Sequence, residues 1–586
     1  MQKKYLFVLL AIIALGAFLR FYQIADIPPG LYPDEAMNGN NALEANATGH
    51  WRVFYPENNG REGLFINLQA ISVAAFGAKP WALRIVSAII GTLTILGIYL
   101  VTKELFAKKE HWIPDQVGND KIRKSDFPRE VRLPLSIGNR KSEIGNHEVA
   151  LLSAFFLATS YWHLNFSRIG FRAIMLPLIA SFALYFLLRG LRTGYMPSLI
   201  AAGIFTGLGA YTYIAYRFMI FVFAVPVVAA MRRWKKDKND VRDLAARKSD
   251  FLREVGLPHK CAPCAIALYG FVALIVILPL ILYFSQNPHD FFNRAGDISV
   301  FSASSPLKEF AKSAFLTLSM LFYKGDGNWR HNLAYAPELN PLVALFFIIG
   351  IIALIRKPIT YHLSPITLFV WLFAMLLPSA LTREGVPHAL RAIGIIPPVM
   401  ILSALGAERI WGAANAWIGR EKMRWPDKIF QLERIRRELL TLFVIVLLTI
   451  PLATYRDYFL RWAERPETYD AFDTSTWRLG QYLASLPGDT KKYIIVNTLG
   501  VKIRGIPASA QTVMFATDTF RDASRNDKNL LYLLRDHTDA ITPAPDTPVA
   551  IALLNGTDHA LIRALRQRFP TLKASAPGDF IVLKNF

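Results

Sequence analysis

The sequence predicts an all-α polytopic membrane protein, with about eleven membrane-spanning helices and a small α/β domain at the C-terminal end. Of 586 residues, 53% are hydrophobic and only 19% are charged, whereas an ordinary soluble domain carries roughly 25% charged residues. The mean hydropathy is +0.29, and the apolar residues gather into blocks long enough to cross a bilayer. This composition excludes a disordered chain, a collagen-like chain and a typical soluble enzyme.

The first apolar block covers residues 5–22 and follows Lys3 and Lys4. A cleaved signal peptide would have an apolar core of about 7–15 residues and a cleavage site made of small residues. This block is longer, and the segment 20–23, which begins with Arg20, offers no such site. We therefore expect an uncleaved first span with its N-terminus in the cytoplasm.

Ten further apolar blocks are expected to span the membrane. They cover residues 80–102, 149–165, 173–189, 196–212, 218–231, 264–284, 340–355, 361–380, 392–412 and 438–455. An odd number of spans places the two termini on opposite sides of the membrane, so the C-terminal segment is expected to be extracytoplasmic.

The distribution of basic residues supports this orientation. The segments expected in the cytoplasm, of which 103–148 and 232–262 are the longest, contain 33 Lys and Arg residues, and the loops expected outside contain 14. Cytoplasmic loops of membrane proteins are rich in Lys and Arg. This bias accounts for most of the net charge of +22 without nucleic acid as a partner. We expect an integral protein of a bacterial or archaeal plasma membrane, in contact with membrane lipids.

The two long cytoplasmic loops share a peptide. Residues 123–134 match residues 247–258 at ten of twelve positions. We interpret them as two copies of a mobile element that entered permissive loops, because exposed loops tolerate insertion. The alternative is a paired docking motif for a cytoplasmic partner.

Cys261 and Cys264 are the only cysteines, which excludes a disulfide scaffold. A C-x-x-C pair can be redox-active or can supply half of a zinc site, but no βαβ unit surrounds it and only His259 lies nearby. We expect two incidental thiols at the membrane edge.

The first outer loop, 23–79, is expected to form two juxtamembrane helices over the outer mouth of the bundle. The segment 33–48 has a helix-compatible composition and begins with Pro33, where the missing N–H costs nothing. The segment 63–77 is apolar but too short for a comfortable span, so it suits a helix at the interface.

The chain divides into a transmembrane domain, 1–460, and an α/β domain, 461–586. The tail contains alternating helix-like and strand-like segments and no nucleotide-binding glycine loop. We expect a cap or an acceptor-docking module without catalysis. Its expected helices are 477–486 and 558–569, the latter capped by Asp558, and its expected strands are 492–497, 548–555 and 580–583.

Ionisable residues near the membrane are functional candidates because burying a charge in lipid is costly. On the expected outer face, a carboxylate pair, Asp34 and Glu35, occurs together with several basic residues. This combination suits an anionic lipid head group that meets a general base. The simpler interpretations are interfacial anchoring for each arginine and helix-dipole complementation for the carboxylates. The basic residues are Arg61, Arg168, Arg172, His388 and Arg391.

The order of these motifs resembles the GT-C superfamily of glycosyltransferases that use polyprenyl-phosphate-linked sugars. The most similar group is the glycosyltransferase family 39-like one, which contains the protein O-mannosyltransferases and aminoarabinose transferases. The similarity covers roughly residues 1–460. It is strongest at 1–106, where Pro-Asp-Glu-Ala occupies 33–36 after the first span, and in the segment 160–168.

The resemblance implies roles for individual residues. The group carries its catalytic base in the first outer loop, which matches Asp34, with Glu35 beside it. A Lys- or His-Pro-Pro-Leu motif of the group matches Arg61 and the three residues after it; the prolines are absent here and arginine replaces the phosphate ligand. His388 and Arg391 resemble the basic residues that face the donor phosphate.

The activity implied by the resemblance is transfer of a sugar from a polyprenyl phosphate to an acceptor hydroxyl of a glycan, lipid or protein on the extracytoplasmic face. The leaving phosphate needs cations, for which Arg168 and Arg172 are further candidates, and the hydroxyl needs a base. A single displacement would invert the anomeric carbon. We expect no cofactor and no metal, although Asp34 and Glu35 could ligate a divalent ion.

Two alternatives remain from the residues alone. A transporter or flippase of lipid-linked glycans would show internal repeats, broken helices and charges at the bilayer midplane, whereas the candidate charges here lie at the ends of spans. A non-catalytic anchor for the tail would leave the charges of the outer loops without a role.

Overall fold

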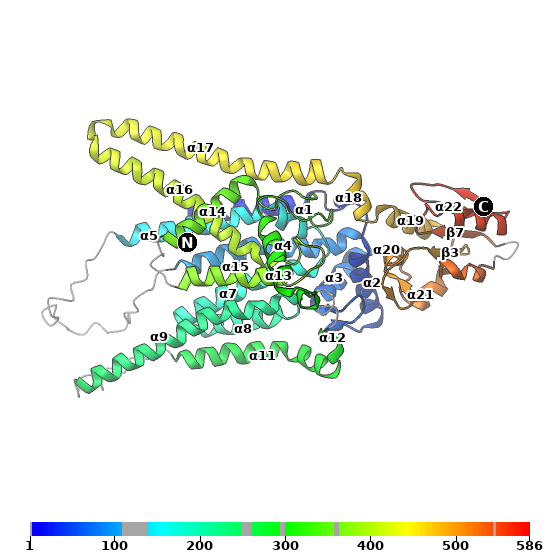
Figure 1. Ribbon diagram of the computed structural model, residues 1–586, viewed down its shortest axis with the longest axis horizontal. Helices are drawn as coiled ribbons and strands as arrows, with labels where there is room; N and C mark the ends of the chain where they lie inside the picture. The colour runs from blue at the N-terminus through cyan, green and yellow to red at the C-terminus, as the bar shows by residue number, and fades with distance from the viewer. Residues whose placement is uncertain (1–2, 108–137, 248–260, 293–298, 357–362, 543–546) are drawn as a thin grey trace.

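The computed structural model describes residues 3–107, 138–247, 261–292, 299–356, 363–542 and 547–586. In these residues, eight helical segments are long and apolar enough to cross a membrane. They contain α1 (Lys3–Phe21), α4 (Pro80–Leu105), α7 (Met175–Thr193), α9 (Met219–Arg247), α11 (Ala262–Gln286), α15 (Leu363–Ala380), α16 (Ile396–Arg424) and α17 (Ile429–Tyr455). The long helices run side by side along the length of the molecule (Figure 1).

The three remaining predicted spans coincide with shorter apolar helices. These are the His147–Ala158 part of α5 (Gly138–Ala158), α8 (Met196–Gly209) and α14 (Pro341–Arg356). The prediction of an all-α polytopic membrane protein is confirmed. The N-terminus lies near one end of the bundle and the C-terminal domain lies beyond the other (Figure 1), as an odd number of spans requires.

Two regions differ from the expected loops. The segment 285–340 contains α12 (Pro288–Phe292) and α13 (Pro306–Ser319). The segment 418–437 is mostly helical, because no helix breaker occurs before Pro426, and only the short η7 (Pro426–Lys428) separates α16 from α17. Figure 1 shows these two helices as a hairpin that projects from the bundle.

The pair of cysteines before α11 was predicted to be two thiols, and this is wrong. Cys261 and Cys264 form a disulfide at the start of α11. The helical turn brings positions i and i+3 onto one face, so the two sulfur atoms meet. The duplicated peptides, 123–134 and 247–258, lie almost wholly outside the described residues.

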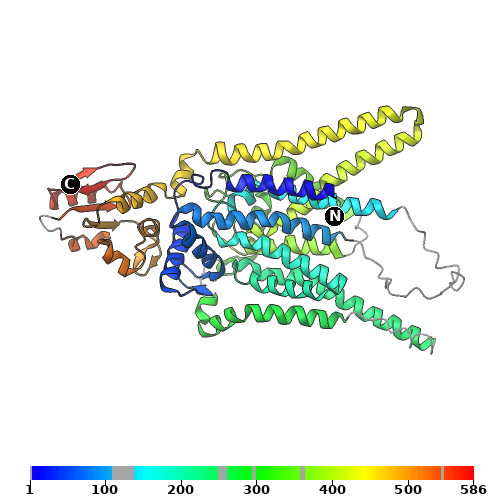
Figure 2. The ribbon, with the colours of Figure 1, turned by 180° about the vertical axis from the view of Figure 1, so that it is seen from behind.

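A layer of short elements follows α1. It consists of α2 (Pro33–Thr48), the antiparallel strands β1 (Phe54–Tyr55) and β2 (Arg61–Glu62), and α3 (Gly63–Phe76). Both helices occupy the predicted segments. A Cβ at Gly63 would lie 2.0 Å from the carbonyl oxygen of Arg52, so the sharp turn from β2 into α3 requires glycine. Seen from behind, α2 lies between the bundle and the C-terminal domain (Figure 2).

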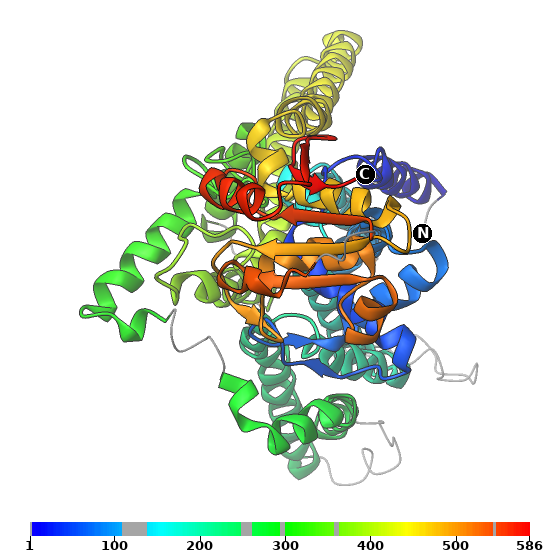
Figure 3. The same ribbon diagram turned by 90° about the vertical axis from the view of Figure 1, so that its right-hand side faces the viewer.

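The C-terminal domain is built on a five-stranded sheet of order β6-β3-β7-β9-β8, and Figure 3 shows its orange and red strands running side by side across the view. Strand β3 pairs in parallel with β6 and β7, and β9 is antiparallel. Alternate residues of β3 point to two apolar cores: Ile494 packs with α19 on one face, and Ile495 packs with α22 on the other. The strands are β3 (Lys491–Val496), β6 (Leu530–Leu534), β7 (Val549–Leu553), β8 (Lys573–Ser575) and β9 (Val582–Lys584), and the helices are α19 (Thr474–Ser485), α20 (Gln511–Thr517) and α22 (His559–Arg568).

The C-terminal domain is fastened to α2. Met37 of α2 belongs to the apolar core on one face of the sheet. Asn40 donates to the side chain of Gln511 at 2.9 Å. Arg504 pairs bidentately with Glu44, at 2.8 and 2.9 Å, and also donates to Glu57 at 3.0 Å. The first loop is therefore held between the bundle and the last domain.

Candidate active site

Asp34 lies in the first turn of α2, with its side chain half-buried. The helix begins at Pro33, whose fixed φ suits a first helical position, and the N-terminal dipole favours a negative charge there. Asn58 donates to Oδ1 of Asp34 at 2.7 Å. The other carboxylate oxygen accepts no hydrogen bond from the described residues, so it is available to a ligand.

The β1–β2 turn presents Asn58 to Asp34. Asn58, Asn59 and Gly60 all have positive φ angles, of 53°, 65° and 77°. Left-handed residues in succession are uncommon and close a very tight turn. Such backbone conformations cluster at functional sites, and here the turn supplies the hydrogen-bond donor to the carboxylate.

Arg61 is buried directly behind this turn. Its guanidinium donates to the side-chain oxygens of Asn38 at 2.7 Å and Asn41 at 2.5 Å, both on α2. Burial, together with the charge of Arg172, lowers the pKa of Arg61 to about 10, against the opposing effects of Glu57 and Asp34. Arg61 is still a cation at neutral pH, and it lies within the electrostatic reach of Asp34.

Glu62, the next residue, holds Arg172. The Nε of Arg172 donates to Glu62 at 2.6 Å, and the guanidinium lies 5.7 Å from the ring centroid of Tyr213. The Arg172 side chain remains 19% exposed, so it can still contact a ligand. Arg61 and Arg172 thus place two cations near Asp34.

Glu35 faces the opposite way from Asp34. Its carboxylate is fully buried, pairs bidentately with Arg84 of α4 at 3.0 and 2.9 Å, and accepts from the backbone N–H of Gly170 at 2.6 Å. Arg84 also donates to the carbonyl oxygens of Pro28 and Gly30. Such a carboxylate has no accessible oxygen for proton transfer, and its geometry fits a positioning role.

Arg168 is directed away from Asp34. Its guanidinium is buried and donates to the carbonyl oxygens of Leu19, Arg20 and Ile27 at 2.8–3.0 Å. It therefore ties the end of α1 to the turn before α7. This arrangement suits a structural clamp better than a phosphate ligand.

His388 and Arg391 lie on the turn between α15 and α16. Arg391 donates to the Thr382 side chain at 2.9 Å and to the Glu384 carbonyl at 2.6 Å. Burial, with the nearby charges of His331 and Arg391, lowers the pKa of His388 well below its usual value. The low pKa of His388 disfavours its charged form, and Arg391 is a cation of this turn.

A carboxylate–histidine cluster surrounds His388. Asp326 lies 2.9 Å from Nδ1 of His331 and 3.9 Å from Nδ1 of His388, and it accepts from the N–H of Ala389 at 2.8 Å. Burial raises the pKa of Asp326, but the hydrogen bond from His331 and the neighbouring histidines outweigh it, so the pKa lies below its usual value.

Asp326, His331 and His388 could together hold a metal ion, because one ligand atom from each lies within 4.8 Å of the others. Nitrogen and carboxylate ligands of this kind suit zinc and similar ions. Asp34 and Glu35 do not form such a group, since Glu35 is occupied by Arg84. Our expectation of a metal-independent protein remains a prediction.

The structure thus brings Asp34, Arg61 and Arg172 together and separates Glu35 and Arg168 from them. Sequence reasoning missed Arg84, although a charge within an apolar block is a signal for function or structure. It also missed Asn58, Asp326 and His331, for which the sequence offers no comparable signal because their roles depend on contacts across loops.

The fold is similar to that of a known glycosyltransferase. Two crystal structures of ArnT from Cupriavidus metallidurans match the whole chain. The structure bound to undecaprenyl phosphate has a TM-score of 0.57 at 13% identity and is covered to 99%. The apo structure has a TM-score of 0.54 at 14% identity and is covered to 98%. The chain therefore has the GT-C fold, and the fold expected from the sequence is confirmed.

No protein-family model and no curated protein matches this sequence. The fold is thus the firm result of the comparisons.

Proposed function

We propose that this protein is an integral-membrane glycosyltransferase that moves a sugar from a polyprenyl-phosphate donor to an acceptor hydroxyl. The observation that carries the proposal is the half-buried carboxylate of Asp34, with one unoccupied oxygen, beside the cations Arg61 and Arg172. The fold supports it, since the similar ArnT structure binds undecaprenyl phosphate.

The residues divide the chemistry between them. Asp34 acts as the general base that accepts the proton of the acceptor hydroxyl. Arg61 and Arg172 stabilise the donor phosphate as its negative charge develops, and Arg391 is the further cation of the neighbouring turn. Glu35, through Arg84, positions the start of α2. A single displacement at the anomeric carbon inverts its configuration.

The reaction belongs to the extracytoplasmic face, where lipid-linked sugars are available and nucleotide sugars are not. The bias of basic residues supports this placement of the α2 layer. The candidate charges lie at one end of the helices rather than at the midplane, which does not favour a transporter.

A panel of radiolabelled polyprenyl-phosphate sugars, incubated with membranes that contain the protein, tests the proposal. Transfer of label to an acceptor fraction from one donor, abolished by heat and reduced in Asp34→Asn, is the expected result. Uptake of intact lipid-linked sugar across sealed vesicles without transfer would contradict it and would support a flippase.

A further inference from the structure

A cavity lies beside α17, at the end of the bundle that carries the C-terminal domain. It has a volume of about 250 Å³, slightly below the ~300–1,000 Å³ of pockets for drug-sized ligands. Its walls come from α5, α6 (Tyr161–Phe166), the loop before α14, α16, α17 and the π-helical segment η8 (Arg456–Trp462). π-helical turns occur frequently at functional sites. Among the described residues, its lining includes none of Asp34, Arg61 and Arg172.

Glu338 forms part of this cavity, and one of its oxygens has no partner. The residue is 2% exposed. Its Oε1 accepts from the backbone N–H of Asp326 at 3.2 Å, while its buried Oε2 makes no hydrogen bond within the described part of the chain. Burial and the charge of Asp326 raise the pKa of Glu338 well above its usual value. Oε2 of Glu338 is therefore a buried polar atom that still lacks a partner among the described residues, which is rare.

Arg456 and Arg461 also line the cavity. Asp457 accepts from Nε of Arg456 at 2.9 Å and from Nη1 of Arg461 at 3.0 Å. Because two guanidinium groups share one carboxylate, the group keeps a net positive charge. Their side chains are 59% and 49% exposed, and arginine binds phosphate bidentately.

The cavity adjoins a lipid-facing surface. Ile450 and Ala453 of α17 line it, while Leu448 and Leu452 of the same helix are 51% and 70% exposed. Exposed leucines on a helix that can span the membrane face lipid. The cavity thus combines an apolar wall at the end of a span with cations at the polar edge, which is the arrangement of a lipid head-group site.

We propose that this cavity binds the phosphodiester head group of a membrane phospholipid. The phosphate contacts Arg456 and Arg461, and a head-group hydroxyl donates to the unpartnered Oε2 of Glu338. The site is distinct from that of the donor and goes beyond the proposed transfer reaction.

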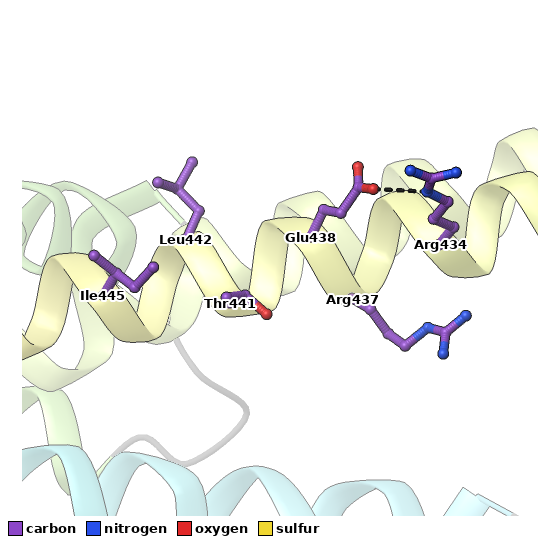
Figure 4. Close-up of a pocket in the computed structure, with 6 residues that line it drawn as sticks. All are labelled: Arg434, Arg437, Glu438, Thr441, Leu442 and Ile445. Carbon is purple, nitrogen blue, oxygen red and sulfur yellow. Dashed lines mark hydrogen bonds and ion pairs between the residues drawn. The ribbon is translucent and has the colours of Figure 1, made fainter.

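Native mass spectrometry of the purified full-length protein, titrated with phosphatidylglycerol, tests this site. Arg456→Ala/Arg461→Ala should bind at least about tenfold more weakly, since charge-assisted hydrogen bonds contribute this much. The matched control is Arg434→Ala/Arg437→Ala, two arginines on the same helix beside a hollow that α17 alone lines (Figure 4). Unchanged binding in the first variant, or equal loss in both, would overturn the proposal.

Further measurements separate the sources of phosphate and test Glu338. Inorganic phosphate should not displace the lipid, and polyprenyl phosphate binding should survive Arg456→Ala/Arg461→Ala; failure of either would make this an anion site or part of the donor site. Glu338→Gln keeps an oxygen acceptor of similar shape and should retain binding, whereas Glu338→Leu should lose it in folded protein. Wild-type binding by the leucine variant would remove Glu338 from the site.

Discussion

Replacing Asp34 with asparagine distinguishes two roles for its carboxylate: a catalytic base, or a charge that only complements the helix dipole. The substitution keeps the shape and can keep the contact with Asn58, but it removes the base. General base catalysis contributes about 10²–10⁴-fold, so turnover should fall by that factor while donor binding changes little. Transfer kinetics with purified protein measure this. Near-normal turnover in well-folded Asp34→Asn would refute the mechanism, though not the fold.

The buried pair of Glu35 and Arg84 should matter for folding rather than for proton transfer. Arg84→Ala leaves a buried carboxylate unpaired, and breaking a buried ion pair in this way costs about 3–5 kcal/mol. Glu35→Gln should be milder and should reduce turnover less than Asp34→Asn. Thermal unfolding in detergent checks the stability; full stability combined with lost turnover in Glu35→Gln would instead make Glu35 a direct participant.

Arg61 and Arg391 are the cations on which donor use should depend. Charge-assisted hydrogen bonds to phosphate are roughly twice as strong as neutral ones. We therefore expect Arg61→Ala or Arg391→Ala to weaken donor use by more than about tenfold, with partial rescue by lysine, which cannot bind bidentately. Donor saturation curves measure the effect. Arg168→Lys is a comparison, since Arg168 donates to backbone carbonyl oxygens and lies over the rings of Tyr458 and Phe459. Wild-type kinetics in Arg391→Ala would exclude Arg391 from the site.

For single residues, the sequence predicts which residues belong to the candidate site better than it predicts where their side chains point. Asp34 and Arg61 could be selected because a carboxylate and a cation at the ends of apolar segments are unusual. The neighbouring Glu35 looks equivalent in the sequence, yet one step along a helix turns a side chain by about 100°, and this brings it to Arg84 instead. Contacts between segments 49 residues apart cannot be read from local patterns.

At the scale of elements, the shared inserts should be dispensable. Deleting 110–146 or 236–260 removes basic segments that include the start of α5 and the end of α9 but no residue of the candidate site. We expect membrane insertion and transfer to persist, because exposed loops tolerate such changes. Yield of folded protein and the transfer rate measure this, and loss of folded protein after either deletion would show that the loops are structural.

The sequence predicts elements well where a single physical rule decides them. Helix α2 begins at Pro33 as expected, and Asp558 caps α22 by accepting from the N–H of Leu561 at 3.1 Å. Strand β6 was missed because its short apolar run resembles a helix turn as much as a strand. Helix α13 was missed because its lysines and glutamate obscure the apolar pattern.

At the scale of the whole molecule, the orientation in the membrane is the principal prediction. The C-terminal domain and α2 share one end of the bundle (Figure 1). One measurement therefore determines on which side of the membrane both lie. Reporter fusions placed after Tyr455 should be active outside the cytoplasm, as the distribution of basic residues requires. A cytoplasmic signal there would reverse the topology and the proposed face of the reaction.

The ion pair between Arg504 and Glu44 also constrains the order in which the contacts of the molecule can form during synthesis. These two residues are 460 positions apart. The ribosome therefore synthesises α2 early and Arg504, which pairs with it, much later. Thr512, which donates to the carbonyl oxygen of Leu31 at 2.9 Å, arrives later still. A nascent chain with every span already inserted still lacks these contacts between the first loop and the C-terminal domain, which can form only when synthesis is nearly complete.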